Sequence, residues 1–216
     1  MSRAFSNCSM TVDLREDLVR SVAEPVPCQR HVNRTDHGAQ HEVSERIVYL
    51  MRGLPSCGKS RRARELAGAD GVVCETDEFF HTQVGDCSLE FSYDSDRQQE
   101  ARDWNYHRFT AAVDENVSPI VVDRGNGLNR ETQRYAQYAV DRGYNVIIAE
   151  PDAPWWQEIR VLLKYKAHTM PVLEKWAEEL ATKNRSTHRT PAKTILRWMR
   201  NWRWDVTVKS ILEYCE

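Results

Sequence analysis

Residues 53–60 read Gly53-Leu54-Pro55-Ser56-Cys57-Gly58-Lys59-Ser60 and match the pattern G-x-x-x-x-G-K-[ST] at every position. Glycine lets the chain come close enough for backbone N–H groups to surround a di- or triphosphate. The lysine of this pattern bridges the β- and γ-phosphates, and the final hydroxyl holds Mg²⁺. The preceding stretch, 46–52, is apolar and predicts a short strand, whereas 59–66 predicts a helix. The loop therefore ends at a helix N-terminus, whose dipole favours anions.

We predict from this loop that the chain binds a nucleoside triphosphate with Mg²⁺. The alternative is a glycine-containing turn that carries an unrelated lysine. The predicted nucleotide contacts come from Gly53, Pro55, Ser56, Cys57, Gly58, Lys59, Ser60 and Arg61.

The composition narrows the class of protein. A chain of 216 residues suits one domain with an appendage. No apolar run approaches the roughly 18 residues that cross a bilayer, and residues 1–20 lack the apolar centre of a signal peptide. Six cysteines occur without a C-x-x-C pair, which argues against a zinc site or a disulfide framework. We expect a cytoplasmic protein, with the nucleus as an alternative location, and the sequence leaves the oligomeric state open.

The charge is distributed unevenly along the chain. A net charge of −2 argues against a protein that coats nucleic acids, yet residues 181–212 hold eight Lys or Arg and one acid. This basic segment is either a solvated helix face or an anion-binding lid or phosphate-backbone track.

Strand and helix patterns alternate after residue 44. Continuous apolar runs predict strands at 46–52, 71–76, 118–123 and 145–150, with helices at 59–68, 96–116 and 130–142 between them. This alternation predicts an α/β fold with a doubly wound parallel sheet. Residues 1–44 read as a flexible extension, and 45–216 as a P-loop kinase domain. Its last part, about 152–216, predicts a helical lid region with helices near 154–167, 171–184, 191–203 and 205–214.

Three carboxylates follow the predicted strands, where parallel sheets bind their ligands. Asp77 would accept the proton of an attacking hydroxyl, or else cap the next short helix. Asp123 ends a run typical of a Walker B strand and would help to hold Mg²⁺, or else serve as a turn residue. Glu150 precedes Pro151 and is assigned no chemistry.

Several further motifs accompany the phosphate loop. They comprise 49–55, 76–80, Glu100-Ala101 with Trp104-Asn105, 118–123 with Asn126, 143–146 leading to Glu150-Pro151, Leu180-Ala181, Lys183-Asn184, Pro191 and Met199. Together they resemble the 5′-hydroxyl polynucleotide kinase branch of the small P-loop kinases, near the kinase domain of the animal Nedd-four-binding protein two group. The resemblance implies ATP and Mg²⁺ at Lys59 and Ser60, Asp77 as general base, and Asp123 near the metal.

Three polar residues are candidates for contacts with the acceptor, and three cations of the basic segment are candidates for the lid. The predicted acceptor contacts are Arg124, Asn126 and Asn105, and Arg124 could instead replace a lid arginine. The predicted lid cations are Lys183, Arg185 and Arg189, because phosphoryl transfer requires positive charge over the transferred group. The tryptophans at 155–156 and 198–204 predict either core packing or base stacking.

The leading hypothesis is an ATP-dependent kinase that phosphorylates the 5′-hydroxyl of RNA or DNA. A kinase for a small-molecule hydroxyl and a non-catalytic ATP-binding module are the alternatives.

Overall fold

The computed structural model describes residues 45–84, 88–91, 93–185 and 189–215. Our prediction for residues 1–44 lies outside these ranges. The described residues belong to one compact unit, Val43–Glu216.

A four-stranded parallel sheet forms the centre of the domain. Its strands are β1 (Ile47–Met51), β2 (Val72–Glu75), β5 (Ile120–Asp123) and β6 (Asn145–Ala149), in the order β2-β5-β1-β6. In the centre of the sheet, Leu50 of β1 aligns with Val122 on one side and Ile148 on the other. The four predicted strands are confirmed, each shortened by one or two residues.

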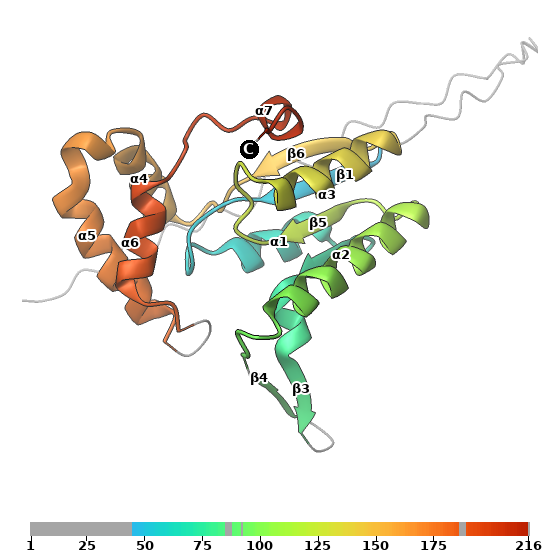
Figure 1. The fold of residues 1–216 in the computed structure, drawn as a ribbon, viewed down its shortest axis with the longest axis horizontal. Coiled ribbons are helices and arrows are strands. Elements are labelled where there is room, and N and C mark those ends of the chain that lie inside the picture. Colours follow the sequence, from blue (N-terminus) through green and yellow to red (C-terminus); the bar gives the residue numbers. More distant parts are fainter. Residues whose placement is uncertain (1–44, 85–87, 92, 186–188, 216) are drawn as a thin grey trace, which may run out of the picture. The chain divides into compact units, whose positions relative to one another are not determined.

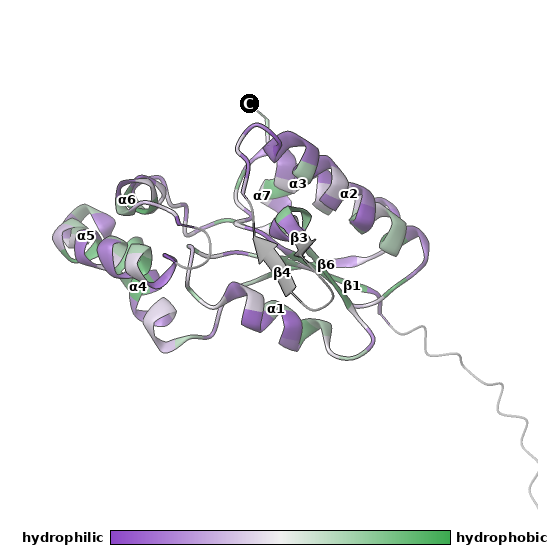
Figure 2. Cartoon of the chain, turned by 90° about the horizontal axis from the view of Figure 1, so that it is seen from below, coloured by the Kyte–Doolittle hydropathy of each residue, from purple (hydrophilic) through white to green (hydrophobic). Residues whose placement is uncertain are grey.

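Helices cover both faces of this sheet (Figure 1 and Figure 2). Helix α1 (Lys59–Ala67) packs on one face, where Met51 and Val121 meet Ala63 and Ala67. Helices α2 (Gln98–Asp114), α3 (Arg130–Asp141) and α7 (Val208–Leu212) pack on the other face. Alternate residues of β1 pack into two different cores, one on each face of the sheet, because successive strand side chains point to opposite faces. The doubly wound α/β prediction is confirmed.

The helical region after β6 lies beside the sheet (Figure 1) and has a hydrophobic core of its own. It consists of α4 (Pro154–Lys164), α5 (Lys166–Lys183) and α6 (Ala192–Arg200). Its core also includes Leu54 and Cys57 from the phosphate loop. The loop is therefore packed against the lid helices. The buried members of this core are Leu54, Cys57, Ala153, Trp156, Ile159, Leu163, Leu173, Ala177, Leu180, Ile195 and Met199.

Helix α5 begins five residues before the predicted start at residue 171. Pro171 lies inside the helix, although proline favours the first helical turn. A proline at this position leaves the carbonyl of Ala167 without its helical donor. Ala167 is exposed, so water can satisfy that carbonyl, and the prediction that the helix starts at Pro171 was wrong.

A small hairpin follows β2 and was not predicted. After the 3₁₀ helix η1 (Thr76–Phe80), strands β3 (His81–Val84) and β4 (Ser88–Phe91) pair in antiparallel fashion. The sequence marked only a turn between them. Strands of four residues give too short a pattern to be distinguished from a loop.

Candidate active site

The phosphate loop connects β1 to α1 in a tightly curled conformation. Gly58 has φ 87° and is the N-cap of α1, so a side chain there would be strained. The Cys57 N–H donates to the Leu54 carbonyl at 3.4 Å, and the Lys59 ammonium donates to the same oxygen at 2.8 Å. The lysine thus folds back across its own loop, close to the N-terminus of α1.

Gly53 is required by a different constraint, which is space. A Cβ atom at this position would lie 3.1 Å from the Pro151 side chain and 3.3 Å from Cγ of Lys59. Both distances are tighter than ordinary contact. The segment that leaves β6 therefore crosses the start of the loop closely, and glycine makes room for it.

Cys57 contributes packing and its backbone to the loop. The side chain is buried among the lid helices. Burial raises the pKa of the thiol to about 12, although the nearby Lys59 and Lys183 charges oppose this effect. The thiol is therefore protonated at neutral pH and is no nucleophile there.

Asp123 lies at the C-terminal end of β5 and is only 5% exposed. Its Oδ2 atom has no hydrogen-bond partner among the described residues. A buried carboxylate oxygen without a partner is costly, so it is available for a cation. The chain just after Asp123 is bonded to β1, the strand that precedes the phosphate loop, because the Asn126 N–H donates to the Met51 carbonyl at 3.3 Å.

The residues present fit a bound Mg²⁺. This ion binds through one or two protein ligands together with substrate phosphates and water. Asp123 and the hydroxyl of Ser60, in the first turn of α1, are the residues that would hold it. The described residues contain no cluster of three or more His, Cys, Asp or Glu side chains, so they offer no metal cage that is independent of phosphate.

Asp77 lies in the first turn of η1, beyond the end of β2. Two residues earlier, Glu75 aligns with Asp123 across the β2–β5 pair. Asp77 and Asp123 therefore follow neighbouring strands at the same edge of the sheet. The 3₁₀ helix is fixed to α2, since Glu78 pairs with Arg108 and the Phe79 ring lies 5.7 Å from the Trp104 ring.

Two predicted acceptor residues are buried and serve the fold. Asn105 is 0% exposed, and its amide donates to the Cys74 carbonyl at 3.4 Å and to the Tyr135 hydroxyl at 3.2 Å. Asn126 donates to the Met51 and Val122 carbonyls at 2.8 and 2.9 Å and so joins the ends of β1 and β5. These contacts engage the amide N–H groups of both residues inside the protein, whereas the Asn105 Oδ1 atom has no hydrogen-bond partner among the described residues. The assignment of both residues to the acceptor stays a prediction.

Arg124 belongs to a network of arginines around Glu131. It pairs directly with Glu131, whose carboxylate also lies 3.6 Å from Arg102 and 3.7 Å from Arg134. Burial opposes the charge of Glu131, but the hydrogen bond from Arg124 and the three guanidinium charges outweigh it and lower the pKa of that carboxyl. Arg124 thus lies at the predicted edge of the sheet and is paired there with a carboxylate that two other arginines share.

Only Lys183 among the predicted lid cations has a described contact toward the loop. Its ammonium lies 4.4 Å from the centre of the Trp155 ring, and that indole donates to the Ser56 carbonyl at 3.1 Å. Arg185 and Arg189 are exposed beyond the end of α5. Residues 186–188 between them lie outside the described ranges.

Sequence reasoning missed an ion pair beside the loop in which the arginine is buried and the glutamate is partly exposed. Arg52, 4% exposed, lies 3.5 Å from Glu150, and its guanidinium is 4.0 Å from the Trp202 ring centre. Burial lowers the pKa of Arg52, and Glu150 partly offsets this effect. Glu150 also pairs with Arg160 at 2.8 Å. The sequence signal that could have revealed this pair is an arginine directly after an apolar strand.

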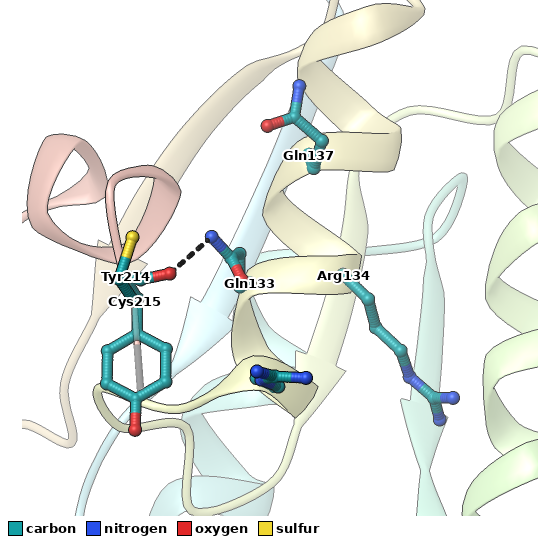
Figure 3. A pocket seen from close by; sticks show the side chains of 6 residues that line it. Gln133, Arg134, Gln137, Tyr214 and Cys215 are labelled. Atoms are coloured by element: carbon teal, nitrogen blue, oxygen red, sulfur yellow. Dashed lines mark hydrogen bonds between the residues drawn. The ribbon is translucent and has the colours of Figure 1, made fainter.

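A surface hollow lies away from these residues, between α3 and the end of the chain (Figure 3). Gln133 crosses it and donates to the carbonyls of Leu212 and Tyr214. Its described lining contains none of the residues assigned to the site, and consists of Arg130, Gln133, Arg134, Gln137, Tyr214 and Cys215.

Comparison with known protein families identifies the family of this chain. Residues 48–201 match the AAA domain family. The chain belongs to this family. The match runs from β1 to the end of α6. It therefore includes the phosphate loop of this AAA domain, the strand ends near Asp77 and Asp123, and the lid helices. The AAA domain is thus a P-loop domain of the nucleotide-binding, kinase-like type.

Curated relatives resemble parts of this AAA domain. Human NEDD4-binding protein 2 is 33% identical over 113 residues, which are 51% of this chain and 6% of that protein. YLP motif-containing protein 1 is 27% identical over 130 residues, or 50% of this chain, and the aligned part is 6% of the human and 9% of the mouse protein. The chain thus spans a small part of the length of these relatives. No helix in the described part is long and apolar enough to cross a membrane.

Proposed function

We propose that this chain is an ATP-dependent kinase that transfers the γ-phosphate to the 5′-hydroxyl of a polynucleotide, RNA or DNA. The observation that carries the proposal is the common sheet edge of Asp77 and Asp123 beside the phosphate loop. A module that only binds nucleotide needs no carboxylate in the position of Asp77. Similarity to part of NEDD4-binding protein 2 supports the kinase-like class.

In the proposed reaction, the acceptor hydroxyl oxygen attacks the γ-phosphorus and the bond to the β,γ-bridging oxygen breaks. The hydroxyl proton passes to the Asp77 carboxylate, and ADP leaves with the bridging oxygen. Lys59 and the loop N–H groups stabilise the negative charge on the phosphates. Lys183, with Arg185 and Arg189, supplies further positive charge from the lid side. Bound Mg²⁺ would neutralise charge on the β- and γ-oxygens.

The test is transfer of labelled γ-phosphate from ATP to single-stranded oligonucleotides with a free 5′-hydroxyl. Oligonucleotides of the same sequence with a 5′-phosphate are the matched control. Asp77→Asn should lower kcat strongly and leave the ATP Kd close to that of the wild type, because the amide cannot accept the proton. A collapse of ATP affinity with little change in kcat would instead make Asp77 a metal or nucleotide ligand.

The charge of the chain favours a small-molecule hydroxyl as the second candidate acceptor. The net charge is −2, and Arg124 at the acceptor edge is already paired with Glu131. A small acceptor requires no long cationic track. Neutralising Arg185 and Arg189 together distinguishes a polynucleotide acceptor from a small one. With a polynucleotide, the KM should rise and lose part of its salt dependence. Release of labelled inorganic phosphate without a labelled acceptor would indicate hydrolysis only.

A further inference from the structure

The Trp155 side chain lies between the phosphate loop and the lid. It is the second residue of α4 and is half-buried. Its indole N–H donates to the Ser56 carbonyl at 3.1 Å, while the Lys183 ammonium lies 4.4 Å from its ring centre. One side chain therefore contacts both the loop backbone and the last residue of α5.

The hydrogen bond to Ser56 constrains one peptide unit of the loop. Ser56 has φ 57°, a left-handed conformation that is uncommon for a residue with a side chain. The Ser56 carbonyl and the Cys57 N–H belong to the same trans peptide, so they point in opposite directions. When the indole holds the carbonyl outward, the N–H is directed to the inner side of the loop.

The inner side of the loop already gathers donors. The Cys57 N–H and the Lys59 ammonium share the Leu54 carbonyl as acceptor, at 3.4 and 2.8 Å. Phosphate oxygens are stronger acceptors than a peptide carbonyl, because they are charged. Both donors are thus arranged to turn to a common anion, and the orientation of the Cys57 N–H depends on the Ser56 carbonyl.

The aromatic face of Trp155 holds the lid cation. Lys183 also lies 6.0 Å from the Trp176 ring centre, and Trp176 is itself fixed by a hydrogen bond to Glu158 at 3.3 Å. An ammonium over an indole face is attracted by the negative charge of the ring face. This attraction is modest for a partly exposed pair, so the lysine can move to a phosphate nearby.

We propose that Trp155 is a positioning residue for the nucleotide phosphates. Its indole N–H fixes the Ser56–Cys57 peptide with the N–H directed into the loop, and its ring keeps Lys183 beside that loop. The inference rests on the proposed function only as far as nucleotide binding by the loop, and it is independent of the acceptor.

Trp155→Phe is the decisive variant, since it keeps an aromatic face for Lys183 and removes the donor. We expect its Kd for Mg·ATP to rise about three- to tenfold, as for the loss of one hydrogen bond. Inorganic triphosphate, used as a competitor without the nucleoside, should lose affinity by the same factor. The matched control is Trp198→Phe, which alters an exposed indole on α6 and should leave both affinities unchanged.

Two further measurements separate positioning from packing. We expect ATP to change the tryptophan emission of the wild type and of Trp198→Phe, and to leave the emission of Trp155→Phe unchanged. Lys183→Met should leave the ATP Kd within about twofold of the wild type and lower the rate of γ-phosphate release or transfer. All binding is measured well below the unfolding midpoints, so that each Kd refers to folded protein.

The outcomes distinguish this inference from the proposed function. If no acceptor is phosphorylated and the Trp155→Phe effect on Kd remains, the kinase proposal is wrong and the role of Trp155 stands. If Trp155→Phe binds Mg·ATP and triphosphate like the wild type, with an unaltered emission change, the indole only packs and the inference is wrong.

Discussion

Replacing Asn126 by alanine tests whether its amide supports the fold or the acceptor. The variant removes two hydrogen bonds, to the Met51 carbonyl at 2.8 Å and the Val122 carbonyl at 2.9 Å. Each such bond contributes about 0.5–1.5 kcal/mol net. Because Asn126 is 6% exposed, water compensates poorly, and we expect a loss of about 2 kcal/mol in the free energy of unfolding.

For a domain of this size, 1 kcal/mol lowers Tm by about 2–4 °C, so Asn126→Ala should lower Tm by about 4–8 °C. Differential scanning calorimetry with nucleotide-free protein measures this shift, and urea unfolding checks it independently. Asn129→Ala is a useful comparison, because Asn129 makes one capping hydrogen bond to the Thr132 N–H at 2.8 Å at the exposed start of α3. Its loss should be about 1 kcal/mol.

The reasoning about Asn126 would be refuted by a Tm within about 1 °C of the wild type. If that unchanged Tm came with a raised oligonucleotide KM, Asn126 would return to the acceptor site. A loss of stability with unchanged KM at a temperature where the variant is folded supports the structural role.

Four other outcomes follow from the site. Lys59→Ala should lower phosphoryl transfer by at least about 100-fold, as for the loss of one strong electrostatic contact, and Lys59→Arg should not restore it; more than about a tenth of wild-type activity in Lys59→Ala would contradict the assignment. Asp123→Asn should raise the Mg²⁺ concentration required for half-maximal ATP binding, measured by titration, while metal-free ATP binding stays close to wild type. The folded-state pKa of Glu131 is lowered from its ordinary 4.5. The ionised carboxylate therefore stabilises the folded protein fully above that pH, and this contribution is lost as the pH falls through the folded-state pKa. The Tm difference between wild type and Glu131→Gln should be largest near neutral pH and shrink in acid. Cys57, with a pKa of about 12, should resist alkylation at pH 8 while the exposed Cys215 reacts, as peptide mass mapping would show.

The sheet could be predicted because buried parallel strands carry an unusually clear signal. The runs in β1, β5 and β6 are apolar except for a polar residue at one end of β5 and of β6, and Pro119 and Gly143 lie just before β5 and β6. The phosphate loop could be predicted for a similar reason, since its glycines and lysine meet local requirements. The sequence identifies the loop because its recognisable pattern lies within eight consecutive residues, even though Pro151 and the lid helices also constrain it.

Features that depend on distant contacts were not predictable. The pair of Arg52 with Glu150 joins residues from two different strand ends, and the amide of Asn105 is engaged by β2 and α3. A polar residue at such a position looks the same in sequence whether it faces a substrate or a carbonyl inside the protein. Trp155 presented this ambiguity too, because neither core packing nor base stacking describes its hydrogen bond to the loop.

The shared core of Leu54, Cys57 and the lid helices has a consequence for the modularity of the domain. A truncated protein ending at residue 151 would retain all four strands of the parallel sheet and the whole glycine-rich sequence. It would nevertheless lose the apolar side chains on which Leu54 and Cys57 rest. Grafting a foreign lid at this junction would meet the same obstacle, because the graft must reproduce the surface beneath the loop. Residues 45–151 are therefore not a transferable nucleotide-binding cassette.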